Sequence, residues 1–255
     1  MLEKERMQST LTIARTPGKL RKFRLYCFCY AGGNASAYLP WQSALISEVE
    51  LYAIQLPGRG AYWNEKPYTS LQDLIPALAT LIGQQEKMPF AFFGHSLGAM
   101  LAFELTRYCR DHALPLPEHL FMSGSDAPQY RSPSKRLHEL PDDALIEALR
   151  KYDGTPAELF EHRDLMALVL PTIRADFALV ANYQYFAAPL LNTPLTVFAG
   201  RHDEHVLIEH VEEWRRETSG NFRMCWFEGG HFFINSERQA VLAELNATLA
   251  RLIHR

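Results

Sequence analysis

Short apolar runs alternate with longer amphipathic stretches along most of the chain. The apolar runs are rich in aromatic and branched side chains, and several stop at a turn signal such as Gly32-Gly33, Pro57-Gly58 or Gly94. Strands that are apolar on both faces are typical of parallel sheets covered by helices. The pattern predicts strands at Phe23–Cys29, Val49–Leu56, Phe90–Phe93, Leu120–Ser123, Leu195–Ala199 and Phe222–Phe227.

The amphipathic stretches between these runs carry apolar residues at helical spacing. They predict helices over Leu71–Gln85, Leu97–His112, Val206–Thr218 and Glu237–Ile253. Strands that alternate with helices indicate a doubly wound α/β fold, with a mostly parallel central sheet and helices on both of its faces. We expect one such domain over residues 1–255.

Residues 128–189 interrupt the alternation, because they contain no good strand. Helical patterns cover Glu139–Tyr152, Ala157–Leu170 and Thr172–Phe186, and Pro141-Asp142-Asp143 resembles a helix start. We interpret this region as a helical insertion between two strands. Insertions at this place in an α/β sheet commonly lie over the active-site end and act as lids. The alternative is a packed structural subdomain without a gating role.

Composition narrows the class of protein but names no activity. Hydrophobic residues make up 47% and charged residues 22% of the 255 residues, which suits a globular enzyme and is too apolar for a disordered chain. The 26 basic and 29 acidic residues leave a net charge of −3, which argues against nucleic-acid binding. No apolar run approaches the roughly 20 residues of a membrane span. Because Met1 to Arg6 is charged, we expect a cytoplasmic protein.

The segment Gly94-His95-Ser96-Leu97-Gly98 matches the G-x-S-x-G pattern. An apolar strand is predicted before it and a helix after it, which is the context of a nucleophile elbow. Glycines two residues before and after the serine are needed, because larger side chains would collide there. Ser96 is therefore the candidate nucleophile. The alternative is a serine that only caps the following helix.

A serine hydroxyl needs a base, and in this architecture the acid and then the base follow the serine in the chain. His231 is the best candidate base, because Gly229-Gly230 precedes it in a turn after the last predicted strand. We favour Asp203 as the acid, since it follows the strand Leu195–Ala199 in a Gly-x-x-Asp-x-x-Val loop. Asp203 could instead cap the next helix. Asp126 is the rival acid, and Glu204 is a weaker third choice.

An oxyanion hole needs two backbone N–H donors. One should be Leu97, the residue after the nucleophile, and we assign the other to Ala31 in the turn after the first long strand. The glycines of this turn could also suit a phosphate loop, but no G-x-x-x-x-G-K-[ST] or G-x-G-x-x-G follows. Cysteines and histidines show no zinc spacing either, so we expect neither a cofactor nor a metal.

The whole pattern resembles the type II thioesterases that accompany nonribosomal peptide and polyketide synthases. The resemblance covers residues 20–250 and rests on Cys27-Phe28-Cys29-Tyr30-Ala31-Gly32-Gly33, Gln55-Leu56-Pro57-Gly58-Arg59-Gly60, Phe93-Gly94-His95-Ser96-Leu97-Gly98-Ala99, Arg174-Ala175-Asp176-Phe177, Gly200-Arg201-His202-Asp203 and Gly229-Gly230-His231-Phe232-Phe233. The chain departs from the family at Cys29, where a proline is usual, and in the extension before Thr16.

The resemblance implies an α/β-hydrolase fold and a stand-alone editing hydrolase. Such enzymes remove wrong or stalled acyl groups from the phosphopantetheine arm of acyl carrier and peptidyl carrier domains. The insertion would shape the acyl chamber, while Arg59 is expected to pin its own loop and Asp176 and Phe177 to hold an insertion helix. We expect a monomer that binds neither nucleic acid nor membrane. The alternatives are a carboxylesterase or acyltransferase of the same fold, or a non-catalytic protein that docks on a synthase.

Overall fold

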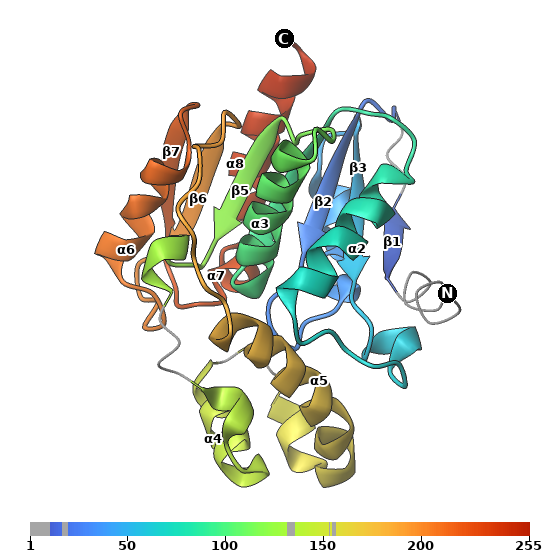
Figure 1. Ribbon diagram of the computed structural model, residues 1–255, viewed down its shortest axis with the longest axis vertical. Coiled ribbons are helices and arrows are strands. Elements are labelled where there is room, and N and C mark those ends of the chain that lie inside the picture. Colours follow the sequence, from blue (N-terminus) through green and yellow to red (C-terminus); the bar gives the residue numbers. More distant parts are fainter. Residues whose placement is uncertain (1–10, 17–19, 132–135, 153, 155–156) are drawn as a thin grey trace.

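Seven strands form one sheet in the order β1-β3-β2-β4-β5-β6-β7 (Figure 1). The computed structural model describes residues 11–16, 20–131, 136–152, 154 and 157–255. The strands are β1 (Thr12–Thr16), β2 (Phe23–Phe28), β3 (Val49–Gln55), β4 (Phe90–His95), β5 (His119–Ser123), β6 (Leu195–Gly200) and β7 (Phe222–Phe227). Strand β1 pairs antiparallel with β3, and all other pairs are parallel. The α/β fold and every predicted strand are confirmed, whereas β1 was not predicted.

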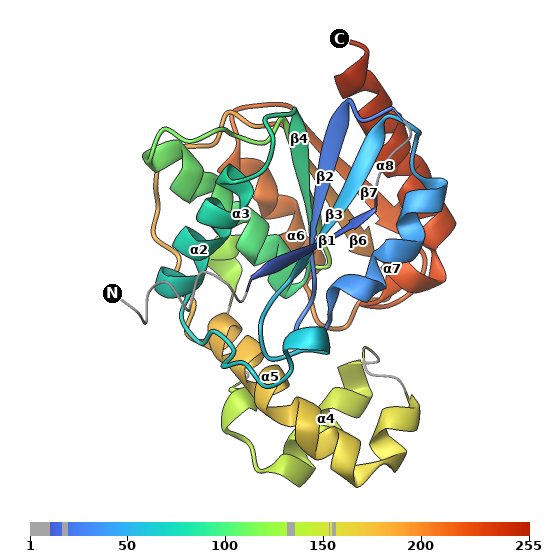
Figure 2. The same cartoon turned by 90° about the vertical axis from the view of Figure 1, so that its right-hand side faces the viewer.

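Helices cover both faces of the sheet, as Figures 1 and 2 show from two sides. Alternating side chains of β2 serve the two faces: Tyr26 and Phe28 belong to one core, and Leu25 and Cys27 belong to the other. Helices α2 (Leu71–Gly83), α3 (Leu97–Asp111) and α6 (Ile208–Glu212) pack on the first face, while α7 (Phe233–Ser236) and α8 (Arg238–Ile253) pack on the second. No helix of the described ranges is long and apolar enough to cross a membrane.

The predicted helix over Val206–Thr218 begins too early and is not a single α-helix. Helix α6 starts at Ile208, and a 3-10 helix, Glu213–Glu217, continues it. Residues 203–207 stay outside the helix because two carboxylates bind their backbone: Asp203 accepts from the N–H of His205, and Asp126 accepts from the N–H of Leu207. Further 3-10 helices, absent from the sequence prediction, connect β2 to β3 (Ala35–Ala37 and Leu39–Ala44) and follow β3 (Gly60–Tyr62).

The helices between β5 and β6 lie beyond the carboxyl ends of the strands, below the sheet in Figure 1. They are α4 (Asp142–Tyr152), α5 (Arg163–Ala181) and 3-10 helices at Pro128–Tyr130, Leu137–Glu139 and Ala157–Glu161. A small apolar core joins α4 to α5, consisting of Leu145, Leu149, Met166, Leu170 and Ile173.

The prediction of two helices, Ala157–Leu170 and Thr172–Phe186, is wrong. Helix α5 runs without a break through Pro171 and ends at Ala181. Proline removes one backbone hydrogen bond from a helix interior. Buried neighbours on either side compensate, since Leu170 packs in the small core and the Thr172 hydroxyl donates to the carbonyl oxygen of Gly58.

Candidate active site

Ser96 stands at a sharp turn between β4 and α3. Its backbone has φ 57° and ψ −111°, in the left-handed region that side chains rarely adopt. The Ser96 N–H donates to the carbonyl oxygen of Ser123 at the end of β5, 2.8 Å away, which fixes the turn to the sheet. A Cβ on Gly94 would overlap the backbone of Gly98, and a Cβ on Gly98 would overlap the backbone of Phe28. The two flanking glycines are therefore required by close backbone approach.

His231 lies in the loop after β7 and is hydrogen-bonded to Asp203 in the loop after β6. The distance from His231 Nδ1 to Asp203 Oδ2 is 2.8 Å, and the two side chains are 6% and 0% exposed. The other oxygen of Asp203 accepts from the N–H of His205 at 2.9 Å. Both carboxylate oxygens are thus engaged, and the Nδ1 contact leaves the Nε2 edge of His231 available for another partner.

Asp126 and Glu204, the other candidate acids, have different surroundings. The Asp126 carboxylate accepts from the N–H of Leu207 at 3.1 Å and lies 3.7 Å from His210 Nδ1. Burial raises the pKa of Asp126 above its usual value. Glu204 is exposed beside the same cavity. The structure therefore joins His231 to Asp203, while Asp126 holds the end of the loop that carries Asp203.

The turn with Ala31 is tied to the insertion by a buried ion pair. Asp176 on α5 accepts from Arg59 through both carboxylate oxygens, at 2.7 and 2.8 Å, and the exposed fractions of the two side chains are 1% and 7%. Asp176 Oδ2 also accepts from the N–H of Gly32 at 2.7 Å, and Arg59 donates to the carbonyl oxygen of Gly33 at 2.8 Å. Asp176 ties α5 to this turn, as expected, whereas Arg59 was expected to pin its own loop and its short contacts instead reach Asp176 and Gly33. The same contacts fix the backbone on both sides of Gly32, which has φ +75°.

One cavity of about 330 Å³ brings the candidate residues together. Ser96, His231 and Ala31 line it, as do Phe177, Val180 and Ala181 of α5. Phe177 was expected to hold its helix, but it also forms part of the cavity wall. Leu97 is the first residue of α3, where backbone N–H groups have no partner within the helix. The carboxyl edge of the sheet and the insertion together enclose the candidate site.

The chain matches the thioesterase domain model over residues 23–249. The chain belongs to the thioesterase family. It is 40% identical over 228 residues to linear gramicidin dehydrogenase LgrE of Brevibacillus parabrevis, covering 88% of this chain and 87% of that protein. The name of LgrE refers to a dehydrogenase, but the family model that spans this chain is that of a thioesterase.

Two solved structures agree with this assignment. The type II thioesterase BorB from the borrelidin biosynthetic cluster is 33% identical with a TM-score of 0.84, over 92% of this chain and 96% of BorB. ClbQ from the colibactin NRPS/PKS pathway is 32% identical with a TM-score of 0.85, over 91% of this chain and 98% of ClbQ. Membership of the type II thioesterases, expected from the sequence, is confirmed. The protein is a hydrolase that acts on thioesters.

A second histidine, His95, packs against the ring of His231, the candidate base of this thioesterase. His95 is fully buried, its ring centroid is 5.1 Å from that of His231, and its Nδ1 is 2.9 Å from the Ser123 hydroxyl. Burial lowers the pKa of His95 well below its usual value. His95 is therefore neutral at neutral pH and adds no second positive charge beside His231.

Three residues at this site were missed by the sequence analysis. Arg131 donates to the carbonyl oxygen of Ser96 at 2.9 Å and also to the Ser125 hydroxyl. Tyr152, the last residue of α4, stacks on His205 with the ring centroids 3.8 Å apart and an interplanar angle of 4°. They lie in or against an insertion whose packing no motif describes, so no sequence signal pointed to them.

Within the described residues, no group of three or more His, Cys, Asp or Glu side chains could hold a metal ion.

Proposed function

We propose that this thioesterase hydrolyses acyl groups from the phosphopantetheine thiol of carrier domains, using Ser96 as nucleophile, His231 as base and Asp203 as acid. The observation that carries the proposal is the 2.8 Å hydrogen bond from His231 Nδ1 to Asp203, in a cavity that also contains Ser96. Asp203 would fix the tautomer of His231 and stabilise its protonated form.

Acylation begins when His231 Nε2 accepts the proton of Ser96 and the serine oxygen attacks the thioester carbonyl carbon. The N–H groups of Leu97 and Ala31 would stabilise the oxyanion that forms, because Leu97 begins α3 directly after Ser96 and Ala31 lines the same cavity as Ser96. The carbon–sulfur bond then breaks, and the pantetheine thiol leaves with the proton from His231. A thiolate is a good leaving group, since thiols have a pKa of about 8.5.

Deacylation repeats the same steps with water. His231 accepts a proton from water, the hydroxide attacks the acyl-serine carbonyl, and the same two amides hold the second oxyanion. Ser96 regains its proton from His231 as the acid departs. Each role of His231 requires a fixed ring orientation, which the hydrogen bond to Asp203 supplies.

The names of the relatives support carrier-bound substrates and an editing role. BorB belongs to the borrelidin biosynthetic cluster and ClbQ to a combined peptide and polyketide pathway. In such a role the enzyme acts as a separate protein on stalled carrier domains. The insertion at residues 128–189 would act as the lid that admits the pantetheine arm. A monomeric state and a cytoplasmic location, expected from the sequence, remain predictions.

A panel of acyl-loaded carrier proteins, compared with the matching free esters, tests the proposal. Ser96→Ala should lower kcat by a factor of at least about 10⁴ without a change in unfolding temperature. The matched control is Ser43→Ala, at an exposed serine outside the cavity, which should retain wild-type turnover. Faster turnover of the free esters than of the carrier thioesters would contradict carrier specificity. A fluorophosphonate probe that failed to label Ser96 in folded protein would contradict the nucleophile.

A further inference from the structure

One residue of the insertion reaches the candidate triad directly. Tyr152 is the last residue of α4, and Leu149, one turn earlier, is part of the small core that joins α4 to α5. The Tyr152 ring also packs against Phe177 of α5, with the ring centroids 5.8 Å apart and an interplanar angle of 61°. The packing of the insertion itself therefore sets where the Tyr152 ring lies.

The Tyr152 ring stacks on His205, and both rings pack against His231. The stacked centroids are 3.8 Å apart, with an interplanar angle of 4°. The His231 ring stands nearly perpendicular to both, with its centroid 5.2 Å from that of His205 and 6.2 Å from that of Tyr152. Edge-to-face contacts of this kind favour one relative orientation of the rings. The stack therefore restricts rotation of the His231 ring.

The backbone of His205 links the same stack to the acid of the triad. The His205 N–H donates to Asp203 Oδ1 at 2.9 Å, while Asp203 Oδ2 is 2.8 Å from His231 Nδ1. Burial and the nearby charge of Asp203 raise the pKa of Tyr152, which keeps its ring neutral. A shift of His205 would thus move both the N–H that fixes Asp203 and the ring that packs on His231.

A second tyrosine–histidine stack provides a matched comparison. Tyr130, also from the segment between β5 and β6, stacks on His210 of α6 with the ring centroids 4.3 Å apart and an interplanar angle of 14°. His210 Nδ1 lies 3.7 Å from Asp126, the rival acid. The two stacks share their chemistry, but that of Tyr152 contacts the candidate triad, whereas that of Tyr130 contacts the rival acid.

We propose that Tyr152 is a positioning residue that couples the insertion to the triad, an inference that rests on the proposed function. With α4 docked, its stack on His205 holds Asp203 and His231 in the arrangement that acylation and deacylation both require. With α4 displaced, His205 loses its partner ring, and the His231 ring is less restrained beside Ser96. A displacement of about 1 Å near a reacting group can lower a rate by about 100-fold. Full activity is thereby confined to the state in which the insertion covers the site.

The rate constant for labelling of Ser96 by diisopropyl fluorophosphate tests this role, because this small reagent needs the triad but no carrier domain and no long acyl group. Tyr152→Leu should lower the rate constant at least about tenfold in folded protein. Tyr152→Phe should retain most of it, because the ring that stacks on His205 remains. Tyr130→Leu, which removes the other stack, should stay within about twofold of wild type.

A second readout follows the hydrogen bond between His231 and Asp203 itself. The proton on His231 Nδ1 should give a strongly downfield NMR signal in wild type and in Tyr152→Phe, since it is held by a carboxylate. In Tyr152→Leu this signal should weaken through exchange with water. A tyrosine that only stabilises the insertion would lower the unfolding temperature and leave both the signal and the labelling rate of folded protein unchanged.

Equal labelling of wild type and Tyr152→Leu would overturn the inference, and so would an equal loss in Tyr152→Leu and Tyr130→Leu. Should Tyr152→Leu fail to fold, His205→Leu and His205→Phe replace it, because both keep the backbone N–H that Asp203 accepts and only the second keeps a ring for the stack. His205→Phe should be labelled at least about fivefold faster than His205→Leu, and equal rates would overturn the proposal. Absence of labelling in the wild-type protein contradicts the proposed function itself.

Discussion

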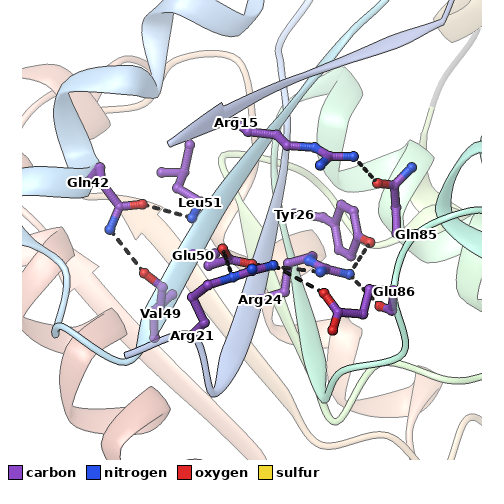
Figure 3. A network of polar contacts seen from close by, with 10 residues as sticks. All are labelled: Arg15, Arg21, Arg24, Tyr26, Gln42, Val49, Glu50, Leu51, Gln85 and Glu86. Atoms are coloured by element: carbon purple, nitrogen blue, oxygen red, sulfur yellow. Dashed lines mark hydrogen bonds and ion pairs between the residues drawn. The ribbon is translucent and has the colours of Figure 1, made fainter. Parts of the chain in front are cut away.

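The two ends of the sheet each bury an arginine–carboxylate pair, but the pairs are built differently. At the carboxyl end, Arg59 and Asp176 meet through two hydrogen bonds of 2.7 and 2.8 Å. At the amino end, shown in Figure 3, Arg24 and Glu50 approach only to 3.7 Å. The exposed fractions of Arg24 and Glu50 are 2% and 3%, so burial alone does not explain the difference.

The amino-end pair is loosely satisfied. Arg24 donates from Nη1 to the Tyr26 hydroxyl and to the carbonyl oxygen of Glu86, and its guanidinium lies over the ring of Tyr52. Its Nε and Nη2 and the Oε2 of Glu50 have no hydrogen-bond partner in the described part of the chain. This pair joins β2 to the adjacent β3, which backbone hydrogen bonds already connect.

The carboxyl-end pair joins three segments that lie far apart along the chain. Asp176 belongs to the insertion, Arg59 to the loop after β3, and Gly32 to the turn that carries the candidate oxyanion donor. The fully hydrogen-bonded pair, Arg59 with Asp176, therefore lies at the turn that carries the candidate oxyanion donor. At the amino end, Glu50 is matched by a second arginine instead, because its Oε1 accepts from Arg21 Nε at 2.6 Å. Substitutions matched between the two ends can test this distinction.

Asp203→Asn should have the largest effect, at the carboxyl end. The amide removes the charge that orients His231, and we expect kcat to fall by a factor of about 10⁴ with the fold intact. The measurement is single-turnover hydrolysis of an acyl-loaded carrier protein. Asp126→Asn is the control and should change kcat by less than about tenfold. The reverse result would assign the acid to Asp126.

Gly98→Ala should be the most damaging change to folding. A Cβ at this position would overlap the backbone carbonyl of Phe28, which cannot move without shifting β2. We expect a loss of more than about 4 kcal/mol in the free energy of unfolding.

Gly83→Ala, at the end of α2, is the matched change, because within the described residues no atom beyond its chain neighbours and its own helix backbone lies within 4 Å of the added methyl group. It should raise stability by about 0.4–1 kcal/mol. Urea unfolding of both variants measures the difference. Similar free energies of unfolding for the two variants would show that the close approach of Gly98 to the Phe28 backbone does not exclude a side chain at position 98.

Asp176→Asn and Glu50→Gln compare the two ion pairs directly. Each removes one charge from a buried pair, and each should cost about 3 kcal/mol or less in the free energy of unfolding. Only Asp176→Asn should also lower kcat/KM, by about tenfold or more, because a misplaced oxyanion donor weakens transition-state stabilisation. Glu50→Gln should stay within about twofold of wild type in kcat/KM. Equal losses of activity in the two variants would remove the distinction between the two ends.

The central fold could be predicted because its strands are apolar on both faces and end at glycine or proline. Strand β1 was missed, since Thr12–Thr16 is a short edge strand with polar positions, and edge strands need no continuous apolar run. Two helices were predicted on either side of Pro171, because local sequence carries no sign of the packing that keeps α5 continuous. The errors thus fall where tertiary contacts override local preference.

Motif-bearing residues of the site could also be predicted, since loops at the carboxyl ends of parallel strands meet at one edge of the sheet. The Gly-x-x-Asp-x-x-Val loop after a predicted strand was enough to favour Asp203, and its hydrogen bond to His231 agrees with that choice. Arg131 and the stack of Tyr152 on His205 could not be found in this way. These contacts depend on how the insertion packs, and no spacing rule encodes that packing.

A pH dependence of stability is expected at the amino end, in a residue that does not line the cavity. His119, at the start of β5, is 7% exposed and lies 2.8 Å from the Thr196 hydroxyl. Burial lowers the pKa of His119 to about 4. In the unfolded chain the pKa is about 6.5, so between these values the unfolded state binds the additional proton. The folded state must therefore lose stability as the pH falls from about 6.5 towards about 4.

His119→Gln removes this titrating group, so its free energy of unfolding should fall less steeply with acid, by up to about 1.4 kcal/mol per pH unit. His95 is present in both proteins, and its contribution cancels in the difference. Urea unfolding at several pH values between 4 and 7 measures the two slopes, while kcat at neutral pH should stay unchanged because His119 is remote from the cavity. Parallel slopes would mean that His119 accepts a proton as readily in the folded state as in the unfolded chain. In that case the amino end would be less tightly packed than its low exposure indicates.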